Sequence, residues 1–152
     1  MEALTLDRVS DAALDEEYRK RFFLKAGARL SSAEDAAKHF NVLFSKDPSR
    51  EHFGVIYLNG ANRVITSEIL FVGSLTASQV HPREIIKRAL EKNAAAIVCS
   101  HNHPSGNTRP SQDDLQITKK IRLACETVEI ALHDHVIVTS EGYYSFADHG
   151  IN

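Results

Sequence analysis

Apolar residues recur at the spacing of a helix face in several parts of the chain. Between residues 31 and 46 they stand at Ala33, Ala36, Ala37, Phe40, Leu43 and Phe44. Ser31 followed by Glu34 has the pattern of a capping box, and Asp47-Pro48 marks the end of the helix. Residues 82–91, with Pro82 in the first turn, and residues 112–127 repeat the helical spacing. The pattern therefore predicts three helices in this part of the chain.

Short apolar runs separate these helices and are typical of strands. Residues 51–58 and 63–73 predict two strands joined by the turn sequence NGAN. Residues 94–100, 131–140 and the end of 141–150 predict three more strands, the first of them fully buried. The order helix, strand, strand, helix, strand, helix, strand, strand indicates an α/β (α+β) sandwich around a mixed β-sheet.

The size of the chain fits one main domain. Its 152 residues are 43% hydrophobic, enough for a single compact core. Residues 1–30 are charged, with scattered apolar positions, and are expected to be helical in part of 11–26. We therefore expect an N-terminal extension over residues 1–30 and a core domain over 31–152.

Charge and cysteine content narrow the functional classes. A net charge of −2 gives no strong electrostatic attraction to nucleic acid or to an anionic membrane surface. Two cysteines, Cys99 and Cys125, cannot form a disulfide framework, which favours a cytoplasmic setting. No apolar run approaches the length of a transmembrane helix, and the acidic N-terminus is unlike a signal peptide.

The segment CSHNHPSGNTRPSQDD, residues 99–114, carries the candidate chemistry. His101 and His103 are two residues apart, so on an extended backbone their side chains point to one side. Asp114 stands at the third position of a helix that Ser111 would cap, where the helix dipole favours a carboxylate. Two histidines and one carboxylate leave a fourth tetrahedral position for water, which is the arrangement of a catalytic zinc.

Spacing alone leaves a simpler interpretation open. An isolated His-x-His pair is a weak signal, and Asp114 could act only as the capping-box partner of Ser111. Ser111 could donate a hydrogen bond to an oxyanion, provided that capping does not occupy its hydroxyl. A metal site and a plain polar loop therefore both fit the pattern.

The same residues resemble a known motif. His101-x-His103, ten residues, then Asp114, with Ser111 three positions earlier, is similar to the JAMM metalloprotease motif of the JAB/MPN superfamily. The hexapeptide HNHPSG resembles the RadC-like branch, as do HPREIIKRAL and LHDHVIV, and the resemblance runs from about residue 31 to 147. It implies a cytidine-deaminase-like α-β-α layout, one zinc per chain, and a hydrolase acting on peptide or isopeptide bonds of a protein substrate.

The resemblance also implies a general acid/base. In this family a glutamate opens a strand as Glu-x-x-Gly before an apolar run, and EHFGVIYL places Glu51 in that position. Glu68, in VITSEILF, is the alternative, although a glutamate in the middle of a strand is more often solvent-facing. We prefer Glu51, because the base must reach a water at the metal.

A second His-x-His pair lies in LHDHVIV. Strand alternation would put His133 and His135 on one face and Asp134 on the other, but no third ligand for a second metal is evident. Either one of the three supports a first-site ligand by a hydrogen bond, or all three are structural. Cys99 is expected to be a small buried hydrophobe rather than a ligand.

Two other functions compete with a zinc hydrolase. One is a non-catalytic interaction module on the same fold, and the other is a DNA-associated protein linked to DNA repair, as the RadC resemblance implies. The mild acidity argues against strong non-specific DNA affinity. Larger RadC-like proteins carry a helix-hairpin-helix region, for which residues 1–30 are too short, so we expect a nearly stand-alone catalytic domain. No oligomeric state is predicted.

Overall fold

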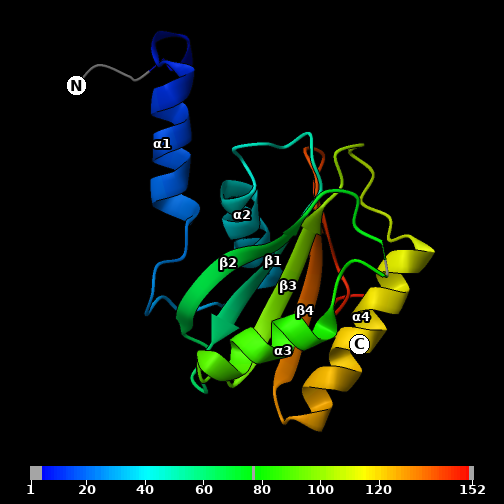
Figure 1. Ribbon diagram of the computed structural model, residues 1–152. Coiled ribbons are helices and arrows are strands. Elements are labelled where there is room, and N and C mark those ends of the chain that lie inside the picture. The colour runs from blue at the N-terminus through cyan, green and yellow to red at the C-terminus, as the bar shows by residue number, and fades with distance from the viewer. Residues whose placement is uncertain (1–4, 77, 151–152) are drawn as a thin grey trace.

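A five-stranded mixed sheet forms the centre of the computed structural model, which describes residues 5–76 and 78–150 (Figure 1). The strand order is β2-β1-β3-β4-β5, and the strands are β1 (His52–Leu58), β2 (Val64–Val72), β3 (Ala96–Asn102), β4 (Ala131–Val138) and β5 (Tyr143–Ser145). β1 runs antiparallel to both β2 and β3, β3 runs parallel to β4, and β5 returns antiparallel to β4. The predicted mixed sheet is confirmed.

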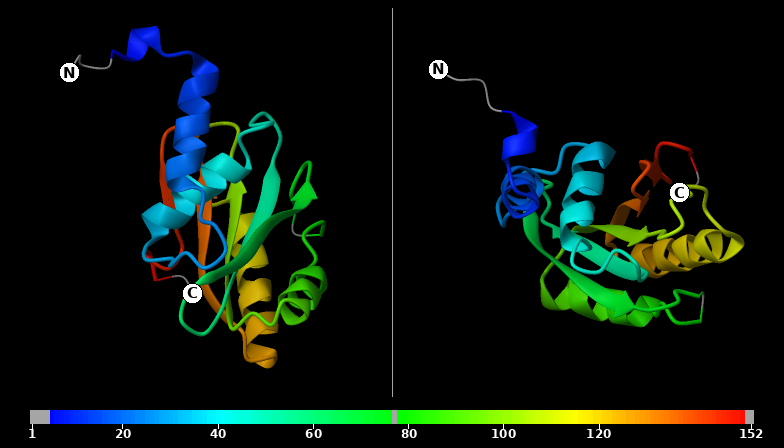
Figure 2. Two further views of the ribbon diagram at one scale, coloured as in Figure 1. Left: turned by 90° about the vertical axis from the view of Figure 1, so that its left-hand side faces the viewer. Right: turned by 90° about the horizontal axis from the view of Figure 1, so that it is seen from above.

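Helices cover both faces of this sheet. α2 (Ala33–Leu43) lies on one face, and α3 (Pro82–Glu91) and α4 (Gln112–Thr127) lie on the other, as the view from above in Figure 2 shows. Two separate apolar clusters result, one beneath α2 and one beneath α3 and α4. Because β1 and β3 are covered on both sides, every residue of both strands is buried. The predicted α-β-α sandwich is confirmed.

The N-terminal segment lies outside this sandwich and contacts α2, where Lys38 Nζ lies 4.7 Å from the centroid of the Phe22 ring. A short 3-10 helix (Leu6–Arg8) and α1 (Asp11–Phe22) contain no buried residue, and α1 projects beyond α2 (Figures 1 and 2). After α1 the chain is attached to α2 by a hydrogen bond that the Leu24 N–H donates to His39 Nδ1 at 2.8 Å. Residues 1–4 of the expected extension and 151–152 of the expected core lie outside the described residues, and the boundary at residue 30 stays a prediction.

The predicted cap of α2 is wrong by one residue. Ser32, not Ser31, is the N-cap, and its Oγ accepts a hydrogen bond from the Asp35 N–H. The sequence SSAED contains two Ser-x-x-acid pairs, so the capping pattern alone cannot choose between them. Burial of one helix face against the sheet settles the register.

A bulge in β4 overturns the expected alternation of the second His-x-His pair. Ile97 of β3 is opposite Leu132, whereas the next residue, Val98, is opposite Asp134, so His133 is left without a partner. His133 is consequently exposed and contacts Asn62, while His135 is buried on the α3 and α4 side. The expectation that the two histidines share a face is therefore wrong.

Candidate metal centre

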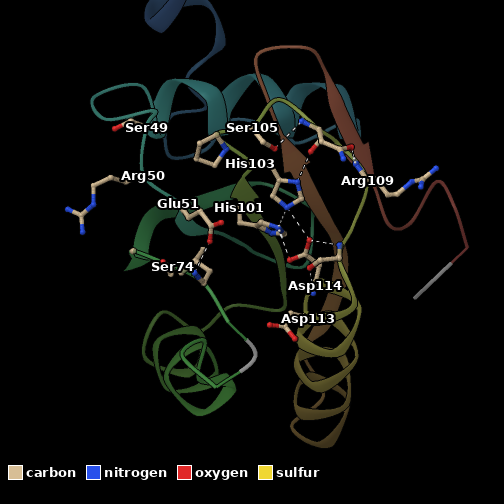
Figure 3. A pocket seen from close by; sticks show the side chains of 15 residues that line it. Ser49, Arg50, Glu51, Ser74, His101, His103, Ser105, Arg109, Asp113 and Asp114 are labelled. Carbon is tan, nitrogen blue, oxygen red and sulfur yellow. Dashed lines mark hydrogen bonds and ion pairs between the residues drawn. The ribbon is translucent and has the colours of Figure 1, made fainter.

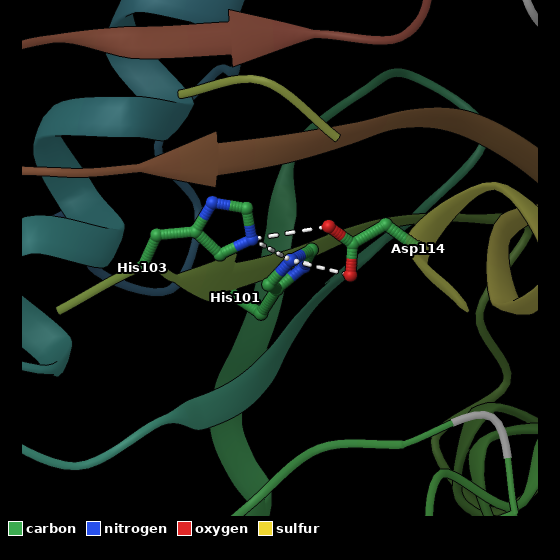
Figure 4. Close-up of side chains that lie close together, drawn as sticks. All are labelled: His101, His103 and Asp114. Carbon is green, nitrogen blue, oxygen red and sulfur yellow. Dashed lines mark hydrogen bonds and ion pairs between the residues drawn. The ribbon is translucent and has the colours of Figure 1, made fainter. Parts of the chain in front are cut away.

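Three side chains converge where the end of β3 meets the start of α4. His101 Nε2 lies 3.0 Å from His103 Nε2 and 3.1 Å from Asp114 Oδ1, and His103 Nε2 lies 3.0 Å from Asp114 Oδ2 (Figure 4). His101 near the end of β3 and His103 just after it lie on one side of the sheet, and the first turn of α4 brings the carboxylate. Among the residues that the structure describes, these three side chains are the His, Cys, Asp or Glu groups whose ligand atoms lie close enough together to hold a metal ion.

Asp114 is both a helix cap and a member of this cluster. Its Oδ2 accepts a hydrogen bond from the Ser111 N–H at 2.9 Å, and its own N–H donates to Ser111 Oγ at 3.1 Å. This capping box fixes the carboxylate at the N-terminus of α4, where the helix dipole also favours its charge. Asp114 can therefore cap α4 and bind a metal at the same time.

The charge of the carboxylate follows from its contacts. Burial alone would raise the pKa of Asp114, but a proton on the Nε2 atom of His101 or His103 would be donated to the carboxylate, and this interaction holds the pKa of Asp114 well below its usual range. The same interaction stabilises the protonated ring and so raises the pKa of His103, and the nearby Glu51 carboxylate acts in the same direction. The cluster thus attracts positive charge.

Hydrogen bonds on the outer nitrogens determine which ring nitrogen of each histidine carries the proton. His103 Nδ1 lies 2.7 Å from the Asn107 carbonyl oxygen, which can only accept, so this nitrogen carries the hydrogen. The Nε2 atom of neutral His103 therefore presents a lone pair to the centre of the cluster.

A longer relay determines the proton position in His101. The Thr118 hydroxyl donates to the Asp114 carbonyl oxygen at 2.7 Å, so it accepts from His135 Nδ1 at 2.6 Å. His135 is fully buried, and burial lowers its pKa well below the ordinary value, so the ring is neutral and its Nε2 accepts. His101 Nδ1, 2.7 Å away, is the donor, which leaves the His101 Nε2 lone pair facing the centre.

With both rings neutral, the consequence is a cluster of acceptors with no hydrogen between them. Two imidazole nitrogens and a carboxylate meet at about 3 Å, an arrangement that a cation in the middle would stabilise. Nitrogen and oxygen ligands about 2.0–2.2 Å from a tetrahedral zinc would lie only slightly farther apart than these atoms do. The residues present therefore fit a zinc ion held by two histidines and one aspartate.

Glu51 faces the same centre from the neighbouring strand. Phe53 of β1 is opposite His101 of β3, and Glu51, two residues earlier and just before β1, points to the same face as Phe53. Glu51 and the cluster line one pocket of about 810 Å³ (Figure 3). The Leu75 N–H holds Glu51 Oε2 at 2.7 Å.

Glu68, the alternative base, is engaged elsewhere. It accepts a hydrogen bond from the Tyr57 hydroxyl at 2.7 Å and pairs with Arg88 at 3.3 Å, and it does not line this pocket. Ser111 does line the pocket, and its capping role uses an oxygen lone pair rather than its hydrogen. The structure therefore brings Glu51 and Ser111 to the cluster and leaves Glu68 away from it.

The other candidates have separate places. Asp134 accepts hydrogen bonds from the Ser145 hydroxyl and from the Ala147 N–H, so it holds the turn after β5 and touches none of the three converging side chains. Cys99 lies in the core beneath α3 and α4, and burial raises the pKa of its thiol, as expected of a small buried hydrophobe.

Thr118 and Asn107, which contact the cluster, are among the residues that the sequence pattern does not reveal. Thr118 faces inward one turn along α4 from Asp114, a spacing that could have suggested contact with the same site.

Comparison with known proteins agrees with this architecture. Residues 30–151 match the family model of the RadC-like JAB domain. The chain is 44% identical over 131 residues to UPF0758 protein YfjY of Escherichia coli, covering 86% of this chain and 81% of that protein. It is 47% identical over 116 residues to UPF0758 protein YeeS of the same organism, covering 76% and 78%. A longer relative, the UPF0758 protein of Haemophilus ducreyi, is 52% identical over 99 residues, which are 65% of this chain and 44% of that protein.

A mixed sheet between helices, with His101, His103 and Asp114 meeting where the end of β3 approaches the start of α4, is the arrangement of a JAB-type domain. This chain belongs to the family of RadC-like JAB domains. None of the helices formed by residues 5–76 and 78–150 is long and apolar enough to cross a membrane.

Proposed function

We propose that this protein is a zinc-dependent hydrolase of the JAMM type that cleaves a peptide or isopeptide bond in a protein substrate. The observation that carries the proposal is the shared pocket, in which an acceptor-only cluster faces the carboxylate of Glu51. A zinc ion bound by His101, His103 and Asp114 would supply a Lewis acid that polarises the amide carbonyl and makes a water nucleophilic near neutral pH.

The protein's own groups supply the remaining chemistry. Glu51 takes a proton from the attacking water through Oε1, because the Leu75 N–H already occupies Oε2. The water oxygen forms the new bond to carbon, the carbon–nitrogen bond breaks, and Glu51 returns the proton to the leaving amine. The Ser111 hydroxyl keeps a hydrogen that can stabilise the negative charge developing on the carbonyl oxygen.

A screen of peptides and isopeptide-linked conjugates tests this proposal. The zinc-loaded wild type should cleave one class, and Glu51→Gln should retain zinc while losing about 100-fold or more of the rate. Glu68→Gln is the matched control and should keep its activity, since Glu68 lies outside the pocket. Cleavage by Glu51→Gln at the wild-type rate would exclude Glu51 as the base.

A further inference from the structure

Asn102 stands between the two histidines of the cluster but faces the other way. Strand alternation turns its side chain toward the α2 side of the sheet, where it is 7% exposed. A polar amide buried at such a place requires hydrogen-bond partners. The oxygen of this amide finds its partner on His52, the first residue of β1, and the nitrogen finds its partner on Arg50, two residues earlier.

The two hydrogen bonds of Asn102 flank Glu51. Asn102 Oδ1 accepts from the His52 N–H at 2.6 Å, and Asn102 Nδ2 donates to the Arg50 carbonyl oxygen at 2.9 Å. The residue between those two backbone groups is Glu51. A single side chain therefore holds the peptide groups on both sides of the glutamate.

The sheet itself cannot supply these bonds. The β1–β3 ladder ends at the Phe53–His101 pair. Beyond that pair the chain after β3 bonds to β4 instead, where the His103 N–H donates to the Val138 carbonyl oxygen. Asn102 replaces the missing backbone partner at this point. On the side of β2, the Gly73 N–H donates a hydrogen bond to the Glu51 carbonyl oxygen at 3.0 Å.

We propose that Asn102 is a positioning residue that couples the histidine-bearing strand to the start of β1 and so fixes the Glu51 carboxylate at the metal centre. The inference rests on the proposed role of Glu51. Because Asn102 is rigidly linked to both histidines through the backbone, it transmits their position to the glutamate without touching substrate or metal.

Cobalt spectroscopy tests the inference without a substrate. In the Co²⁺-loaded protein, the visible absorption bands should change as the water at the ion loses a proton with rising pH. The midpoint pH of this change depends on the charges beside the ion. Loss of the Glu51 charge favours deprotonation there, so Glu51→Gln should lower the midpoint by about one pH unit. Asn102→Leu fills the same space without either hydrogen bond, and it should also lower the midpoint while still binding about one ion.

The double variant Glu51→Gln/Asn102→Leu distinguishes coupling from coincidence. If Asn102 acts through Glu51, the double variant should have the midpoint of Glu51→Gln alone. Asn102→Ala is the second variant to be measured should Asn102→Leu not fold. Val98→Ala, a core change on the same strand and face, is the control for loss of stability and should leave the midpoint in place.

The possible failures are distinguishable. A midpoint that moves in Glu51→Gln but not in the Asn102 variants overturns this inference alone. Full additivity in the double variant, or an equal shift in Val98→Ala, overturns it as well. A midpoint that does not move in Glu51→Gln removes Glu51 from the centre and overturns both this inference and the proposed base.

Discussion

At the scale of single residues, the direction of each hydrogen bond matters as much as the identity of the three converging side chains. Thr118 lies outside the cluster, yet its hydroxyl orients His135, and His135 in turn orients His101. Partners of this kind fix the ring nitrogen that binds a metal and tune its basicity. The relay therefore belongs to the site although none of its outer members faces the pocket.

Thr118→Val should weaken zinc binding. Valine has nearly the same shape as threonine but cannot accept the hydrogen bond from His135, so the tautomer of His101 is no longer fixed. We expect the dissociation constant for zinc to rise about tenfold or more, measured by competition with a chromophoric chelator. Thr127→Val is the matched control, because Thr127 makes the same bond to the carbonyl four residues earlier on α4 without contacting the site. Equal affinities in both variants would contradict the relay.

The sequence contains the converging residues but not the contacts that support them. His101, His103 and Asp114 lie within fourteen positions, so local spacing predicts that they can meet. The partners of Asn102 are about fifty positions away, and His135 is thirty-four positions from His101. Such contacts depend on which strands become neighbours, and no periodicity in one segment reports that.

At the scale of elements, the close approach of α2 to β1 depends on a residue without a side chain. A Cβ built at Gly54 would lie 3.0 Å from the Phe44 ring and 3.1 Å from the Phe40 ring, and both rings are buried. Gly54→Ala should therefore lower the free energy of unfolding by about 1–3 kcal/mol, because the rings must shift within a packed core.

Urea unfolding measures the effect of Gly54→Ala. Gly60→Ala is the control, since a Cβ at that position meets no atom within 4 Å. If Gly54→Ala unfolds at the same urea concentration as the wild type, α2 can move away from β1 without a loss of stability.

The sequence pattern predicts where the helices and strands of the core lie better than it predicts their local irregularities. Apolar spacing indicated each helix and strand of the core, because burial on a sheet face imposes that spacing. The β4 bulge at His133 and the choice of Ser32 as the cap of α2 depend on how neighbouring elements pack, so the sequence pattern could not reveal them.

At the scale of the whole molecule, one buried histidine joins the N-terminal segment to the sandwich. His39 on α2 accepts from the Leu24 N–H through Nδ1, and its Nε2–H donates to Ser67 of β2 at 2.8 Å. The ring is fully buried, and burial lowers its pKa from 6.5 to about 4. Three separate parts of the chain thus meet at a neutral imidazole.

Stability should fall as the pH is lowered from about 6.5 toward 4. The unfolded chain protonates His39 below about 6.5, whereas the folded protein does so only near 4, so acid favours unfolding by up to about 3 kcal/mol. His39→Gln keeps an acceptor for Leu24 and a donor for Ser67 but does not titrate. Urea unfolding across this window should give a smaller loss of stability in His39→Gln, and equal losses would contradict the assignment.

Metal content shows whether His101, His103 and Asp114 hold one zinc ion. Elemental analysis of purified wild-type protein should find about one zinc per chain, with the metal lost in His101→Ala and in Asp114→Ala. His133→Ala is the matched control from the other His-x-His pair, and it should keep its zinc because His133 contacts Asn62 instead. Full zinc retention in both His101→Ala and Asp114→Ala would mean that these side chains do not hold the ion.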